Sequence, residues 1–221
     1  MTMNIRHHVD IATLVSFSAG TLNGSLAAVV AAHISNCAHC SHEVAAMDLV
    51  GATLLSGLPV SLSSAADDHP PMPQQAANHF TPDTDPTSSD KKSAIIPEPI
   101  RRRFGISGNK IRWRRLAPGV WHYRFTQNGK SAGDLRLLKI APGYRMLEHG
   151  HGGTELTLVL EGAFSDSTGE YLPGDIQEVA DEIEHCPTAD RVTGCICLIA
   201  SEEHARFSGL IGRIVQAWTG L

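Results

Sequence analysis

The sequence predicts a multidomain α + β protein, in which a small all-α domain at the N-terminus is followed by an all-β barrel. Two changes along the 221 residues lead to this prediction. Apolar residues recur with a helical period of about 3.6 in the N-terminal part, and with the two-residue period of strands beyond about residue 110. A proline-rich stretch lies between these parts. We therefore divide the chain into residues 1–58, 59–98 and 99–221.

The N-terminal part is expected to contain three helices. Their starts are marked by residues whose side chains can accept a hydrogen bond from a free backbone N–H group. Asp10 caps the first helix, which Gly20 ends. Either Asn23 or Ser25 caps the second helix, and Asn36 is a candidate cap for the third.

Residues 59–98 combine prolines, from Pro70 to Pro97, with Ser, Asp, Thr and Gln. Such a composition buries too little apolar surface to offset the chain entropy lost on folding. We expect a disordered linker there, with at most one short helical piece near Gln74–His79. The run Arg101–Arg115 that follows has seven basic residues and no acidic one. It lacks a recognition helix, so we interpret it as a solvated linker end and first strand.

The C-terminal part is expected to form an all-β sandwich or barrel, because many short strands follow one another at regular spacing. Turn signals such as Pro142-Gly143 and Pro173-Gly174 separate these strands. The candidate strands are Trp121–Phe125, Leu135–Ala141, Leu156–Leu160, Ile176–Val179 and Cys195–Ala200.

Composition and charge predict the cellular compartment of the protein and the partners that it does not bind. A formal net charge of −5 gives no overall attraction to nucleic acid or acidic membranes. No apolar signal segment precedes Asp10. The longest apolar stretch, Leu26–Ala32, is far shorter than the roughly 20 residues that span a bilayer. We therefore expect a cytoplasmic protein without membrane or direct nucleic-acid contact. There its five cysteines stay reduced and act as ligands, redox groups or packing.

A first candidate metal site lies in the segment from His33 to Cys40. On a continuous helix His33, Cys37 and Cys40 fall at about 0°, 40° and −20°, which is one narrow stripe. If Asn36 breaks the helix, the Cys-x-x-Cys pair forms a turn around the same ion. One imidazole and two thiolates are a soft ligand set that suits zinc. Packed core thiols or a redox pair are the alternatives, although no thioredoxin-like βαβ pattern surrounds the cysteines.

A closed zinc site needs a fourth ligand. The nearby candidates are His7, His8, His39 and His42. His39 and His42 point away from the stripe on a continuous helix, which leaves the N-terminal pair. His8, next to the first helix, is the better choice. A helical part of about 60 residues buries little core, so we expect the roughly 10–16 kcal/mol of a structural zinc to be needed for folding.

A second candidate site lies in the segment HGHGGTELTLVLEG. His149, His151 and Glu155 share parity, so their side chains can project to the inside of a barrel from extended chain. His185 can supply a fourth ligand after the Pro173-Gly174 turn. Such a set suits zinc, iron, manganese, nickel or copper, and a polar loop without metal is the alternative. The arrangement matches the first and second cupin motifs.

Together, the IRHH segment, the His-x-x-x-Cys-x-x-Cys spacing and the HGHGGTELTLVLEG segment with His185 resemble the ChrR-type zinc-binding anti-sigma factors. The resemblance covers both domains. It implies a small all-α zinc-binding helical domain followed by an all-β cupin barrel. By motif position, it implies a first zinc on His8, His33, Cys37 and Cys40, and a second on His149, His151, Glu155 and His185.

The resemblance also implies a function. In this family the helical domain binds an extracytoplasmic-function sigma factor, and the cupin domain is required for its release on singlet-oxygen or related oxidative stress. Members tend to have a fourth, sigma-contacting helix after the third. Here that region carries Pro70, Pro71 and Pro73, so such a helix is short, displaced or absent. The alternative function is a cupin dioxygenase with an N-terminal zinc interaction module, which metal identity would distinguish.

Three further groups of residues are each interpreted from their position in the sequence. Cys195 and Cys197 share parity on a strand, so they are either a redox pair or, as we favour, barrel core. Cys186 is interpreted as packing. The stripe through Val44 and Leu54 is expected to be both helical core and partner groove, because a three-helix unit leaves apolar surface uncovered.

Overall fold

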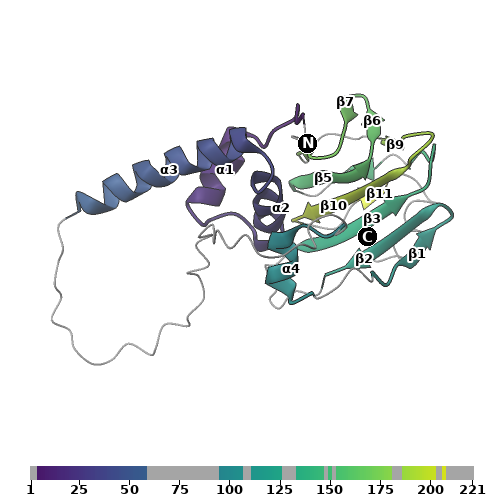
Figure 1. Cartoon of the computed structure of the whole chain (residues 1–221), viewed down its shortest axis with the longest axis horizontal. Coiled ribbons are helices and arrows are strands. Elements are labelled where there is room, and N and C mark those ends of the chain that lie inside the picture. Colours follow the sequence, from purple (N-terminus) through teal and green to yellow (C-terminus); the bar gives the residue numbers. More distant parts are fainter. Residues whose placement is uncertain are drawn as a thin grey trace, which may run out of the picture.

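The computed structural model describes residues 4–58, 95–106, 111–125, 133–146, 153–180 and 186–202, with the backbone of 149–150 and 206–207. Within these ranges the helices are α1 (Ile11–Ser18), α2 (Gly24–Ile34), α3 (Ala38–Ser56) and α4 (Glu98–Phe104). The strands are β1 (Arg114–Ala117), β2 (Val120–Arg124), β3 (Asp134–Ile140), β4 (His149–Gly150), β5 (Glu155–Gly162), β6 (Phe164–Asp166), β7 (Gly169–Tyr171), β8 (Ile176–Val179), β9 (Thr188–Ala189), β10 (Cys195–Ser201) and β11 (Arg206–Phe207). A helical region followed by a β-rich domain confirms the predicted fold class (Figure 1).

The first two helices start where the sequence predicts. The Asp10 carboxylate accepts a hydrogen bond from Ala12 N at 2.8 Å. Asn23, and not Ser25, caps α2, because its side-chain oxygen accepts from Ser25 N at 2.8 Å. Both caps satisfy backbone donors that the first helical turn leaves free.

The third helix starts one residue later than expected. Its N-cap is Cys37, in extended conformation and without a side-chain capping bond, so the assignment of Asn36 was wrong. The side-chain amide of Asn36 instead donates a hydrogen bond from Nδ2 to Ser35 Oγ at 3.2 Å. Because α2 ends at Ile34, the continuous helix is also wrong, and the alternative of a helix break near Asn36 is confirmed. The Cys-x-x-Cys pair then lies at the start of α3 and does not form a separate turn.

The strands form an antiparallel sheet of six, in the order β1-β2-β3-β10-β5-β8, and a sheet of three, β7-β6-β9. Strands β4 and β11 pair separately. The five predicted strands correspond to β2, β3, β5, β8 and β10, with ends that differ by at most two residues. Strands β4, β6, β7, β9 and β11 were not predicted, because two or three residues carry too little periodicity to be recognised.

Helix α2 joins the helical region to the larger sheet. Its side chains of Leu26, Val29 and Val30 are almost completely buried and belong to one apolar core with Leu137 of β3 and Leu198 of β10. Figure 1 shows α2 between the other N-terminal helices and the sheet. The two parts of the chain therefore share a core.

A second apolar cluster fills the inside of the barrel. It contains Leu138 of β3, Val159 of β5 and Phe164 of β6, which come from both main sheets. Cys195 and Cys197 are buried in this cluster, on the face of β10 opposite to Leu198. The interpretation of these two cysteines as barrel core is confirmed. Cys186 is only partly buried, and its thiol donates to Met146 O at 2.8 Å.

Helix α4 was not predicted. The interpretation of Arg101–Arg115 as solvated linker end and strand is wrong for its first residues and right for its last two, which lie in β1. Pro97 precedes the helix, and Gly105 ends it with φ of +60°, a conformation that glycine adopts without strain. Ile100 is completely buried, because α4 packs against α2. The free energy gained when the apolar face of α4 packs against α2 stabilises this helix despite its high density of positive charge.

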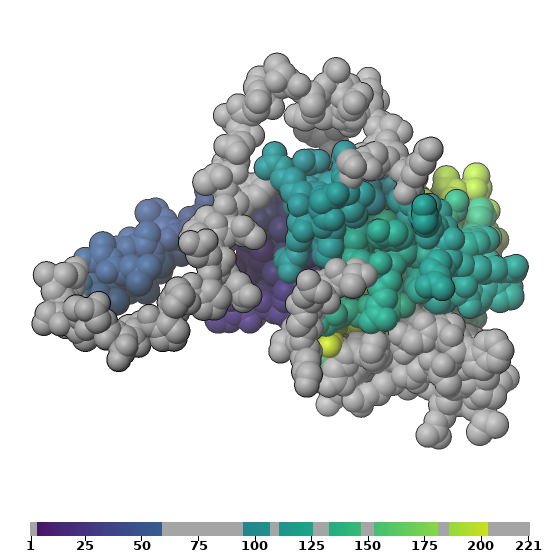
Figure 2. Space-filling model, turned by 90° about the horizontal axis from the view of Figure 1, so that it is seen from below, coloured from purple at the N-terminus to yellow at the C-terminus, as the bar shows by residue number. Residues whose placement is uncertain are grey.

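Helix α3 has a buried start and an exposed end. Val44 is buried and Met47 packs against the core, whereas Val50 and Leu54 are 59% and 69% exposed. Figures 1 and 2 show the blue end of this helix extending away from the barrel. The expected stripe thus serves as core at one end and lies uncovered at the other.

Two further predictions concern the linker and membrane-spanning helices. Residues 59–94 of the expected linker, with the helical piece near Gln74–His79, lie outside the described ranges. Residues 95–98 are described and do not fit a disordered linker, because Ile96 is buried and Glu98 starts α4. Among the described helices, α3 included, we find none that combines the length and apolar character required to cross a bilayer.

Candidate metal centre

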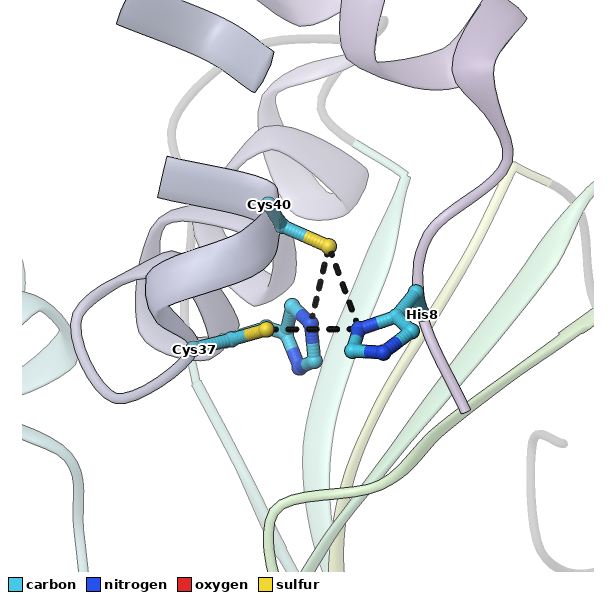
Figure 3. Close-up of side chains that lie close together, drawn as sticks. His8, Cys37 and Cys40 are labelled. Carbon is cyan, nitrogen blue, oxygen red and sulfur yellow. Dashed lines mark hydrogen bonds between the residues drawn. The ribbon is translucent and has the colours of Figure 1, made fainter. Parts of the chain in front are cut away.

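Four side chains converge where the N-terminal segment meets the junction of α2 and α3. The donor atoms of His8, His33, Cys37 and Cys40 all lie within 4.8 Å of one another. Figure 3 shows both thiols pointing from the start of α3 toward the His8 ring. His33, Cys37 and Cys40 lie where α2 ends and α3 begins. His8 lies in the segment before α1.

The distances between the donor atoms fit a tetrahedral zinc ion. His8 Nδ1 lies 3.3 Å from Cys37 Sγ and 3.6 Å from Cys40 Sγ. His33 Nε2 lies 3.3 Å from Cys40 Sγ. Around a tetrahedral zinc with ordinary bond lengths, nitrogen and sulfur ligands are roughly 3.5 Å apart. This His₂Cys₂ cluster could therefore bind zinc with little rearrangement.

The break between α2 and α3 creates this geometry. His33 lies in the last turn of α2, and its carbonyl accepts hydrogen bonds from Asn36 N and Cys37 N, each at 3.0 Å. Cys37 then leaves the helical conformation as the N-cap of α3, and Cys40 follows in the first turn. The chain therefore reverses around the cluster and directs all three side chains inward. His33, Cys37 and Cys40 are buried, whereas His8 is partly exposed.

The electrostatics of the cluster favour a bound cation. Burial is the main cause that lowers the pKa of His33 to about 4, and the nearby His8 contributes. Burial and His39 lower the pKa of His8. Both imidazoles are therefore held neutral, as metal coordination requires. Burial, with Cys37 close by, raises the pKa of the Cys40 thiol to about 11. A divalent cation supplies the positive charge that two buried thiolates need.

The structure separates His8 from the other candidates for the fourth position. His7 turns toward the barrel, where its Nδ1 lies 3.4 Å from Asp175 Oδ2 and its ring lies 4.4 Å from that of Tyr171. The ring of His39 is 4.5 Å from that of His8, but His39 is exposed to solvent, as is His42. The geometry agrees with the choice of His8.

A turn of the barrel surrounds the cluster on its other side. The Nδ1 atom of His33 lies 3.0 Å from Gly174 O. The buried Asp175 accepts hydrogen bonds from Arg6 N at 2.6 Å and His7 N at 3.0 Å. Burial by itself would raise the pKa of Asp175, but the N–H groups of Leu172, Arg6 and His7 hold it below its ordinary value. Sequence reasoning noted Pro173-Gly174-Asp175 only as a turn, because its partners lie far away in the chain.

Of the second predicted site, Glu155 alone has a described side chain. His151 and His185 lie outside the described residues, and of His149 only the backbone is described. Glu155 is buried on the inner face of β5, beside Thr157 Oγ1 at 3.5 Å. Burial raises the pKa of Glu155 to about 8, although Arg136 and Thr157 act in the opposite direction. The four-ligand barrel site stays a prediction.

The barrel also contains charged residues that sequence reasoning missed. Arg136 in β3 is buried and contacts the carboxylate of Asp134. Arg124 Nε lies 2.9 Å from the other oxygen of Asp134. In the sequence the available signal was Arg136 itself, a charged residue between Leu135 and Leu137. It places positive charge near Glu155, inside the barrel.

Comparison with known proteins identifies the chain's relatives. Residues 101–205 match the family described as the ChrR cupin-like domain. The anti-sigma-E factor ChrR of Cereibacter sphaeroides is 37% identical over 217 residues, which are 97% of this chain and 98% of that protein. A crystal structure of Rhodobacter sphaeroides SigE in complex with the anti-sigma ChrR superposes with a TM-score of 0.70 at 36% identity. That match covers 90% of this chain and 99% of the matched one.

The similarity spans the helical region with its His₂Cys₂ cluster as well as the barrel. The relatives are regulators and not enzymes, in agreement with the prediction. At this identity over nearly the whole chain, the protein belongs to the family of ChrR anti-sigma factors.

Proposed function

We propose that this protein is a cytoplasmic anti-sigma factor that sequesters an extracytoplasmic-function sigma factor and releases it on singlet-oxygen or related oxidative stress. The relative from C. sphaeroides is an anti-sigma factor by name, and the matched crystal structure contains SigE. The observation that carries the proposal for this chain is the uncovered apolar end of α3.

This surface, formed by the end of α3 from Leu49 onward and by the residues that follow it to Leu58, is unusual for a protein. Its large apolar side chains are between 59% and 70% exposed, and they are Leu49, Val50, Leu54, Leu55 and Leu58. Large contiguous apolar patches on soluble domains mark binding sites for other proteins. In the second half of the helix, the sequence after Asp48 has no charged residue up to Leu58. A partner with its own apolar helical face suits this surface best.

Helix α1 carries further exposed apolar side chains next to α3. It packs against α3, and its Ile11 and Val15 are 55% and 49% exposed. Ser18 Oγ of α1 donates to the Asp48 carboxylate of α3, which fixes the two helices to each other. A sigma factor bound here would contact the helical region and leave the barrel accessible.

In this proposal, zinc bound by His8, His33, Cys37 and Cys40 has a structural role. Four protein ligands leave no open position for substrate or water. The ion cross-links the N-terminal segment to the junction of α2 and α3, and thereby fixes the direction in which α3 leaves the core. Partner binding would then depend on zinc although no partner residue touches it.

The barrel is proposed to sense the oxidant through a second metal ion. The proposed ligands are His149, His151, Glu155 and His185. Four protein ligands close a zinc site, which favours sensing over turnover. Family resemblance implies that imidazole ligands react with singlet oxygen. A coupling of about 1–3 kcal/mol between barrel and helices changes partner affinity by roughly 5–150-fold, which is enough to switch a promoter.

The proposal is tested by co-purification from the native cell with metal analysis. We expect the tagged protein to retain one sigma factor and to contain zinc, and the purified pair to regain transcription activity after singlet-oxygen treatment. A preparation that inhibits no sigma factor in transcription assays would refute the proposal. If the protein contains iron and consumes oxygen with an organic substrate, the cupin dioxygenase alternative replaces it.

A further inference from the structure

The zinc-ligand cluster is completed by a second layer of contacts, and this layer comes from the barrel. His33 illustrates it directly. Its Nε2 faces the cluster, 3.3 Å from Cys40 Sγ, while its Nδ1 lies 3.0 Å from Gly174 O. A carbonyl accepts but does not donate, so Nδ1 carries the proton and Nε2 keeps a lone pair for a metal ion. The barrel thus selects the tautomer that a ligand requires.

The segment that carries His8 is held by the same turn. Asp175 Oδ1 accepts from Arg6 N at 2.6 Å and His7 N at 3.0 Å, the two residues that precede His8. Asp175 Oδ2 accepts from Leu172 N at 2.9 Å, which closes the turn itself. One completely buried carboxylate therefore orders the barrel turn and the N-terminal segment together.

The next barrel strand extends this attachment beyond His8. Ile176 N donates to His7 O at 3.4 Å. The Glu178 carboxylate accepts from Asp10 N at 3.0 Å and Thr13 Oγ1 at 2.6 Å. His8 is thus bracketed by contacts to the barrel on both sides, in a segment that precedes the first helix.

We propose that Asp175 and Gly174 are positioning residues of the metal centre, so that the conformation of this barrel turn sets the metal affinity of the helical region. Gly174 orients His33 and Asp175 orients the backbone next to His8. Two of the four ligands thereby depend on one barrel turn, whereas Cys37 and Cys40 depend on α3. A disturbance of the barrel at this turn would weaken the helical metal site without chemical change to any ligand.

The coupling must act in both directions, because linked equilibria are reciprocal. Loss of the ion frees His33 and His8 to move, and the turn then loses the partners that order it. Removal of zinc from the helical region is therefore expected to loosen the Leu172–Asp175 turn inside the barrel. This inference rests on the proposed function only in assuming that the cluster binds zinc.

The experiment measures zinc affinity of the full chain by competition with a chromophoric chelator. The variants are Asp175→Ala, Asp175→Asn and the control Asp190→Ala. Asp190 also closes a barrel turn, since its Oδ1 accepts from Val192 N at 2.9 Å and Thr193 N at 2.8 Å. Among the described residues, no hydrogen bond joins it to the N-terminal segment from residue 4 onward. Loss of an outer partner of a metal ligand typically lowers affinity roughly 10–100-fold.

We expect the zinc affinity of Asp175→Ala to decrease by that factor. Asp175→Asn keeps one acceptor oxygen, so its zinc affinity should decrease less. The zinc affinity of Asp190→Ala should change by less than about twofold. The absorption bands of Co²⁺ in the cluster should shift in Asp175→Ala alone. If folded Asp175→Ala and the wild type bind zinc with equal affinity, the inference is wrong, although the zinc site itself is then still supported. Absence of zinc binding in the wild type would refute both.

A second measurement needs no variant, and decides the matter if Asp175→Ala fails to fold. Amide hydrogen exchange of the wild type is followed with and without a zinc chelator. We expect faster exchange at Arg6, His7 and Leu172 after zinc removal, and unchanged exchange at Val192 and Thr193. Protection at Arg6 and Leu172 that does not respond to zinc removal would overturn the coupling.

Discussion

The Nδ1 atom of His33 lies 3.0 Å from the carbonyl oxygen of Gly174, so a helix of the N-terminal region is joined to a barrel turn 141 positions later in the chain. The opposite ring nitrogen faces Cys40. A single imidazole thus connects the candidate zinc centre to the barrel. The following predictions test this centre, the surface of α3 and the barrel.

Cys40→Ala should abolish stable zinc binding and unfold the helical region. The change leaves three ligands and removes a metal contribution of roughly 10–16 kcal/mol, far more than a small helical unit has in reserve. Zinc content and far-UV circular dichroism measure the effect. Cys186→Ala is the control, because that thiol lies outside the cluster. A Cys40→Ala protein that stays helical and inhibitory without metal would show that zinc is not structural.

His8→Ala and His7→Ala should behave differently. His8 Nδ1 lies within 3.6 Å of both thiols, whereas His7 contacts Asp175 and Tyr171. We expect His8→Ala to reduce zinc affinity by more than about 100-fold, beyond the loss of an outer partner. His7→Ala should reduce zinc affinity by no more than roughly 10–100-fold, which is typical for the loss of an outer partner of a ligand. Zinc titration against a chelator distinguishes them, and the reverse order would assign the fourth ligand to His7.

Charges placed on the exposed end of α3 should prevent sigma-factor binding. Leu54 and Leu55 are 69% and 70% exposed, so Leu54→Asp with Leu55→Asp leaves the core intact. Loss of apolar anchors at an interface centre costs about 2 kcal/mol or more each, so we expect affinity to decrease at least about 100-fold. The control is Val192→Asp on the barrel, where the side chain is 84% exposed. Calorimetric titration with the sigma factor decides, and equal affinity of all three proteins contradicts the proposed surface.

The barrel of the metal-free protein should lose stability as the pH rises from about 5 to 8. Burial raises the pKa of Glu155 from 4.5 to about 8, so the folded chain holds a proton that the unfolded chain releases. The stabilisation is complete below the unfolded pKa and is lost as the pH rises through the folded one. The change should be on the order of a few kcal/mol. Urea unfolding with chelator present measures it, and Glu155→Gln should flatten the pH profile. An equally steep profile in that variant would assign the effect to other groups.

The oxidant response should depend on the predicted barrel ligands more than on the barrel thiols. We expect His149→Ala or Glu155→Ala to retain inhibition and to blunt induction by singlet oxygen. Cys195 and Cys197 are buried, and the hydrogen bond between them, followed by burial, raises the pKa of Cys197 well above its ordinary range. The Cys197 thiol therefore holds little reactive thiolate, and replacement of the buried pair by alanine should have a smaller effect. Reporter assays decide, and an essential cysteine pair with dispensable metal ligands would identify thiol oxidation as the trigger.

Features that depend on neighbours in sequence were predictable. Asp10 and Asn23 cap their helices through bonds to residues two positions away, and these bonds need no tertiary contact. The alternation of side chains in β3, β5 and β10 follows from the geometry of a strand. The spacing of His33, Cys37 and Cys40 indicated a shared ion on either of two local geometries. The structure selected the interrupted helix, because α2 ends at Ile34 and α3 begins at Ala38, with Cys37 in extended conformation before it.

Features that depend on distant packing were not predictable. Helix α4 has only seven residues, too few for a recognisable period, and it is stabilised by docking Ile100 against α2. The burial of Arg136 inside the barrel likewise follows from the register of β3 with its neighbours.

The sequence by itself therefore determined the helical and β-rich parts, the family resemblance and the four residues of the first cluster. Tertiary structure alone decided that α2 joins both parts in one core, and that Gly174 and Asp175 hold the segments of His33 and His8. The physical reason is the range of the interactions. Capping and periodicity are set within a few residues, whereas a buried carboxylate gains partners across 169 positions only after the whole chain has packed.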